Sequence, residues 1–154
     1  DTLENVEYPL TAEGIAQMTA PLAADFPGGV RGFVGEMLRP ETAPELREWI
    51  LADIASAPPA VALSAMRDMM GQFVSGAAAT IFEEIRVPVV SVNGDLWPIA
   101  YEANRRHMAS YDAIVLAGAD HFLQLARPAE FNRALAEAIR RVSAPAVPAE
   151  LPAE

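Results

Sequence analysis

Two polar residues follow two apolar runs in the C-terminal part of the chain. The run Val89–Val92 is followed by Asp95, and the run Ala113–Leu116 is followed by His121. Both runs are typical of parallel strands, and the carboxyl ends of such strands meet at one edge of a sheet. A carboxylate that orients an imidazole, and an imidazole that deprotonates a nucleophile, are two members of a catalytic triad. We therefore interpret Asp95 and His121 as a catalytic acid and base.

The third member of such a triad, the nucleophile, is not recognisable in this chain. No Gly-x-Ser-x-Gly turn occurs in the sequence. The serines lie inside expected helices or strands, or beside turns and proline-rich breaks. We expect the nucleophile to lie upstream of residue 1. Asp120, which directly precedes His121, competes with Asp95 as the partner of the imidazole.

Several motifs in the C-terminal part carry a resemblance to a known family. They are Ile85-Arg86-Val87-Pro88, Gly94-Asp95, Gly118-Ala119-Asp120-His121-Phe122 and Arg127-Pro128-Ala129-Glu130-Phe131-Asn132. On these motifs the region 85–142 resembles the C-terminal end of the α/β-hydrolase superfamily, in which nucleophile, acid and histidine follow in that order. The sequence departs from the family pattern at Asp120, where a small residue is common, and at Ala126, where an acidic one is common.

This resemblance implies a fold class and an activity. The expected class is α/β, as a partial α/β-hydrolase fold in which a helical cap is followed by the last two parallel strands and a terminal helix. The expected activity is that of an esterase-like hydrolase acting on a small, largely apolar substrate. Asp95 and His121 would serve a nucleophile in the N-terminal half of the same hydrolase, the implied partner, so the chain alone is expected to be inactive. Asp1 is the runner-up acid, because some family members carry an acid before the cap.

The elements that would position these residues divide the chain into three regions. Residues 1–84 are interpreted as a junction and helical cap, 85–142 as the C-terminal part of the hydrolase core, and 143–154 as a disordered Pro/Ala-rich tail. The second region is predicted to run as strand 87–92, helix 101–108, strand 113–116 and helix 128–142. Two strands leave both edges of a sheet open, so we expect further strands from sequence outside this chain.

The helices of the first region are predicted from apolar spacing and from turn residues. Thr11 is expected to cap the first helix, which the sequence Pro27-Gly28-Gly29 would end, and Thr42 with Pro44 would start another. A set of large apolar side chains is predicted to line a substrate pocket under this cap. They are Phe33, Met37, Met66, Met70 and Trp97. The alternative is that they are core residues, since many such stripes are.

Composition and charge exclude several classes of protein. The chain is 52% apolar and 21% charged, which is typical of a globular protein, and its net charge of −10 argues against nucleic acid as a partner. Its apolar stretches are shorter than the roughly 18 residues that a membrane span needs. Cysteine is absent, which excludes thiolate nucleophiles, and the two histidines show no metal-ligand spacing. No metal or organic cofactor is implied, and we expect a cytoplasmic location.

Two other functions fit the same residues. One is a non-catalytic, ligand-binding or receptor-like protein of the same fold, which would use the capped cavity only to hold a ligand. The other is a truncated fragment without activity of its own. A nucleophile turn upstream of residue 1 would favour the enzyme, and its absence would favour the binding protein.

Overall fold

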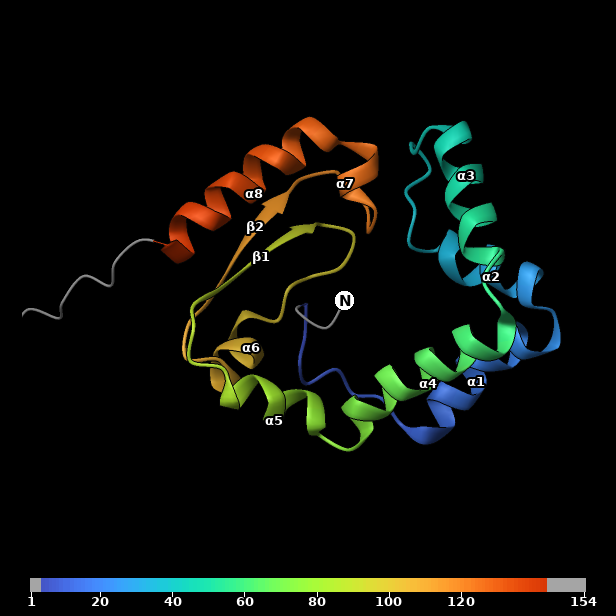
Figure 1. Ribbon diagram of the computed structural model, residues 1–154, viewed down its shortest axis with the longest axis horizontal. Helices are drawn as coiled ribbons and strands as arrows, with labels where there is room; N and C mark the ends of the chain where they lie inside the picture. The colour runs from blue at the N-terminus through green and yellow to red at the C-terminus, as the bar shows by residue number, and fades with distance from the viewer. Residues whose placement is uncertain (1–3, 144–154) are drawn as a thin grey trace, which may run out of the picture.

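The computed structural model describes residues 4–143 of the chain (Figure 1). These residues form eight helices and two strands. The elements are α1 (Ala12–Ala24), α2 (Phe26–Gly35), α3 (Pro44–Ala55), α4 (Pro59–Val74), α5 (Ala77–Glu84), β1 (Val89–Gly94), α6 (Tyr101–His107), β2 (Tyr111–Leu116), α7 (Leu123–Ala126) and α8 (Pro128–Ser143).

The first four helices pack together around one apolar core. Thr11 caps α1 as predicted, and its Oγ1 accepts a hydrogen bond from the backbone N–H of Gly14 at 3.0 Å. The core brings together residues from α1, α2 and α3 and from the turn after α2. Its buried members are Leu22, Phe26, Val30, Val34, Leu38, Ile50 and Leu51. Phe122, next to His121, packs against this core and thereby joins it to the strand region.

The predicted end of the first helix is wrong. Helix α1 ends at Ala24, and the sequence Pro27-Gly28-Gly29 lies in the first turn of α2. Proline is tolerated there because the first N–H groups of a helix have no intrahelical partner. Gly29 allows a close approach of the two helices, since a Cβ on it would lie 2.6 Å from Cα of Leu22.

Strands β1 and β2 form a parallel sheet. Their register runs from Val89 opposite Tyr111 to Gly94 opposite Leu116. Helix α8 packs along this sheet. Helices α5 and α6 lie near the end of the sheet where the two strands begin (Figure 1). The helical arm of α1–α4 curves back, so that the connection between α2 and α3 reaches α7 and the carboxyl ends of the strands.

The predicted α/β fold class is wrong for this chain. Within the described residues the only sheet has two strands of six residues each, whereas eight helices make up most of the structure. The physical reason lies in the packing. The larger core is formed by residues of α1, α2 and α3 and of the turn after α2, whereas the sheet contributes to a smaller cluster around Val6, Met108 and Tyr111. The chain is therefore helix-dominated, and it is not a partial α/β-hydrolase fold.

Single elements of the second region do lie close to their predicted positions. Both strands, α6 and α8 begin and end within about two residues of the predicted bounds, as is usual for predictions from local pattern. Helix α5 was not predicted. The predictions for Asp1 and for the tail from residue 144 onward fall outside the described residues.

No single helix among residues 4–143 is long and apolar enough to cross a membrane. Helices α3 and α4 reach the length and apolar composition of a membrane span only when they are taken together, and the pair is bent by 94°.

Candidate functional site

The two predicted catalytic residues lie in loops that touch each other. Asp95 directly follows β1, and His121 follows β2, at the same edge of the parallel sheet. Asp95 Oδ1 accepts a hydrogen bond from the backbone N–H of Gly118 at 2.8 Å. A Cβ on Gly94 would lie 2.4 Å from the carbonyl oxygen of Ala119, so only glycine fits at this approach. The structure thus brings the two loops together, as parallel pairing predicts.

The carboxylate of Asp95 is held by a second donor as well. Arg39 Nη2 donates to Asp95 Oδ1 at 2.6 Å, and Arg39 Nε donates to the carbonyl oxygen of Ala119 at 3.2 Å. The pKa of Asp95 is lowered, first by the hydrogen bond from Gly118 and further by the charge of Arg39. Asp95 is therefore ionised at neutral pH. Through these two hydrogen bonds Arg39 connects both loops to the segment between α2 and α3.

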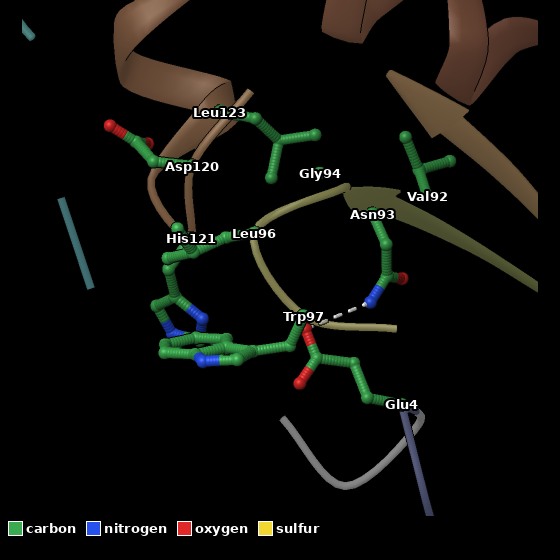
Figure 2. A pocket seen from close by; sticks show the side chains of 9 residues that line it. All are labelled: Glu4, Val92, Asn93, Gly94, Leu96, Trp97, Asp120, His121 and Leu123. Atoms are coloured by element: carbon green, nitrogen blue, oxygen red, sulfur yellow. Dashed lines mark hydrogen bonds between the residues drawn. The ribbon is translucent and has the colours of Figure 1, made fainter. Parts of the chain in front are cut away.

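His121 is half-buried between aromatic rings. Its imidazole meets the Trp97 indole edge-on, with ring centroids 6.1 Å apart (Figure 2). Its ring centroid lies 5.2 Å from that of Phe122, also edge-on. Its backbone N–H donates to the carbonyl oxygen of Met37 at 3.2 Å. Burial lowers the pKa of His121, although the charges of Glu4 and Asp120 oppose this. The imidazole is therefore neutral at pH 7 and has the protonation state of a general base.

The imidazole of His121 faces a small polar pocket. Glu4, Asn93 and Trp97 line this pocket together with it (Figure 2). The amide of Asn93 is buried and donates to Glu4 Oε1 at 3.4 Å. The enclosed volume is about 20 Å³, which is enough for about one water molecule. No hydrogen bond joins the His121 ring to a described residue, and His121 lines this pocket.

Asp120, the alternative acid, is engaged elsewhere. It is 3% exposed, and its Oδ2 accepts a hydrogen bond from the Thr42 hydroxyl at 2.7 Å. Its Oδ1 accepts another from the backbone N–H of Phe122 at 2.9 Å. Both oxygens thus stabilise the loop that carries His121, and the hydroxyl contact anchors this loop to the helical arm.

The five predicted substrate-pocket residues are not gathered in one place. Of them, only Trp97 lines the pocket at His121. Phe33 and Met66 pack against the helical core, and Met70 is buried in α4. Met37 reaches the site through its backbone carbonyl oxygen. Phe33, Met66 and Met70 thus occupy positions in or against the core, which is the alternative stated above, whereas Met37 is only half-buried.

Three site residues were not predicted from the sequence. Arg39 and Glu4 lie far from the strands in the chain, and no local pattern marks them. Asn93 carries a signal that could have found it, because a polar side chain near the carboxyl end of a buried strand points to a site. In the part of the chain that the structure describes, no group of three or more His, Asp or Glu side chains could hold a metal ion.

No protein-family model matches this sequence, and no curated protein matches it either.

Proposed function

We propose that this chain supplies the base and the acid of an esterase-like hydrolase. In this proposal His121 is the general base, Asp95 is the carboxylate that assists it, and the nucleophile lies outside residues 1–154. The observation that carries the proposal is the state of His121. Its imidazole is half-buried, has a lowered pKa and faces a pocket with room for a water molecule. A hydrolysis consumes one water molecule, and a neutral imidazole is the group that commonly deprotonates it.

The structure holds Asp95 beside the histidine loop. Its Oδ1 accepts hydrogen bonds from Arg39 and from the backbone N–H of Gly118, and no hydrogen bond joins Asp95 to His121 among the described residues. In the proposed reaction His121 takes the proton of the nucleophile and returns it to the leaving group. The ionised Asp95 stabilises the imidazolium that forms between these two steps. Arg39 and Gly118 keep the carboxylate close to the histidine loop.

A neutral imidazole and a carboxylate in neighbouring loops support hydrolysis of an ester-like substrate, and Trp97 supports an apolar one. The indole is 37% exposed at the pocket, where it can contact an apolar group outside the water-sized space. That space is far below the 300–1,000 Å³ that is usual for a ligand site. The site at His121 therefore fits a reacting water molecule better than a stored ligand.

One observation favours the ligand-binding alternative. A mostly apolar hollow of about 390 Å³ lies against α1 and α4, which is within the usual size for a small ligand. Its lining residues are Ala12, Ile15, Ala16, Thr19, Ala20 and Arg67. None of them belongs to the site at His121, so binding there would be a function separate from the hydrolysis.

The test is hydrolysis of short-chain p-nitrophenyl esters. We expect none from residues 1–154 alone, and turnover from a longer polypeptide that supplies the nucleophile. His121→Ala should then lower kcat by about 100-fold or more, the usual contribution of a general base. Asp95→Asn should also lower kcat, since the imidazolium loses its stabilising charge.

Arg31→Gln is the matched control, because Arg31 forms an exposed ion pair with Glu48 outside the site. It should leave turnover unchanged. Turnover by residues 1–154 alone that His121→Ala abolishes would show that the nucleophile lies within this chain. Full activity of His121→Ala in the longer polypeptide would refute the proposed function.

A further inference from the structure

The second histidine, His107, is held between two carboxylates. Its Nδ1 lies 2.8 Å from Glu83 Oε1, and its Nε2 lies 2.7 Å from Glu7 Oε1. A carboxylate accepts hydrogen bonds but has none to donate, so both ring nitrogens must carry a proton for both contacts to form. The geometry is that of an imidazolium. It connects three parts of the chain, since His107 ends α6, Glu83 lies in α5 and Glu7 precedes α1.

The segment that carries Glu7 leads directly to the candidate site. Glu4, at its start, lines the pocket beside His121. The carbonyl oxygen of Glu4 accepts a hydrogen bond from the backbone N–H of Ala100 at 2.8 Å. The backbone N–H of Val6 donates to Asn104 Oδ1 at 3.0 Å. Residues just before α6 and within it thus hold this segment against the pocket.

We propose that residues 4–10 form a strap that begins at the wall of the candidate pocket, and that the protonated His107 anchors the strap, so that loss of this proton loosens it. A neutral imidazole carries one ring proton. It can therefore donate to Glu7 or to Glu83 but not to both, and one carboxylate then faces a lone pair. Through Glu4, which lines the pocket, the strap makes the pocket wall dependent on pH. This proposal goes beyond the hydrolytic function and does not depend on it.

The pKa shifts give the direction and the range of this dependence. The pKa of His107 is raised above its ordinary 6.5, first by the hydrogen bond to Glu83 and then by that to Glu7. The stabilisation from the two hydrogen bonds of His107 is therefore fully present below pH 6.5, and it is lost as the pH rises through the raised pKa of His107. The pKa of Glu7 is lowered from 4.5 to about 2, first by Arg106 and then by His107. On the acid side the contact with Glu7 is therefore lost as the pH falls through about 2.

Other charged groups lie on the same elements. They are Glu4 on the strap, Glu84 in α5, Arg86 after α5, and Glu102, Arg105 and Arg106 in α6. Arg106 binds Glu7, and Arg86 donates to carbonyl oxygens at the end of α5. Carboxylates and guanidinium groups ordinarily keep their charge around neutral pH, whereas imidazole titrates there. A change near neutral pH in how firmly the strap is held is therefore assigned to the titration of His107.

The test is amide hydrogen exchange measured by NMR from about pH 5.5 to 9, a range that brackets ordinary imidazole titration. Exchange rates are corrected for their intrinsic pH dependence. In the wild type, protection of the Val6 and Ala100 amides should fall as the pH rises. The expected fall is about tenfold for each unit by which folding raises the pKa of His107. His107→Gln should remove the step and leave low protection at every pH. His107→Lys, which stays charged, should remove the step and retain protection at high pH.

His121→Gln is the control histidine variant and should keep the step. The amide of Ala119, bonded to the carbonyl oxygen of Leu116, reports on the sheet edge and should show no step. Protection of Val6 that does not change with pH in the wild type would overturn the proposal. A step that persists in both His107→Gln and His107→Lys would overturn it as well.

Discussion

The hydrogen bond between Thr42 and Asp120 connects the helical arm to the histidine loop, and its loss should be measurable. Thr42→Val replaces the hydroxyl with a methyl group, so the shape is kept while the Asp120 carboxylate loses one donor. Both residues are buried, at 9% and 3% exposure, so water cannot readily replace the hydroxyl. A hydrogen bond to a charged group contributes about 1.5–3 kcal/mol. The other oxygen of Asp120 keeps the Phe122 N–H. We therefore expect the free energy of unfolding to fall by about 2 kcal/mol.

Urea denaturation followed by far-ultraviolet circular dichroism measures this change through the midpoint at constant m-value. Thr42→Ser is the matched control, because it keeps the hydroxyl and removes only a methyl group. It should lose less stability than Thr42→Val. If Thr42→Val unfolds within about 0.5 kcal/mol of the wild type, as a neutral surface change does, the hydrogen bond does not hold the loop and our reasoning is wrong.

Two further predictions concern the scaffold. Gly29→Ala should lower the free energy of unfolding by about 1–3 kcal/mol, because its Cβ would overlap the backbone of Leu22. Gly32→Ala in the same helix meets no atom within 4 Å and should leave stability unchanged or raise it by about 0.5–1 kcal/mol; equal urea midpoints for the two variants would contradict this. Asn104→Ala should cost about 1–3 kcal/mol in the same assay, because the buried amide (0% exposed) would no longer accept the N–H of Val6; a wild-type midpoint would show that water takes its place.

The order of elements after Ile85 could be predicted because its signals are local. A β-branched run indicates a strand wherever it occurs, and Pro128 is suited to the first turn of a helix. The closeness of the Asp95 and His121 loops followed from the same pattern, since two parallel neighbours have their carboxyl ends at one edge. These predictions needed no knowledge of distant residues.

The predictions that were wrong depended on contacts between distant residues. The apolar spacing of the terminal helix predicts that Leu135, Ala138 and Ile139 face inward. Ala138 is buried as predicted, but Leu135 and Ile139 are 39% and 54% exposed, and Ala134 is buried although it was not predicted to be. The periodicity showed that the helix has an apolar side. It did not show which part of that side finds a partner.

Thr42 shows most clearly what the sequence by itself determined and what the tertiary structure decided. The sequence alone determined that a helix starts here, because proline at position 44 is favourable in a first turn. It also placed an acid and a histidine after two strands. Only the tertiary structure decided that the Thr42 hydroxyl binds Asp120, 78 residues away, instead of capping α3. A hydroxyl binds whichever acceptor the fold brings within reach, and a buried carboxylate binds it more strongly than an exposed helix end does, because water competes less in the interior.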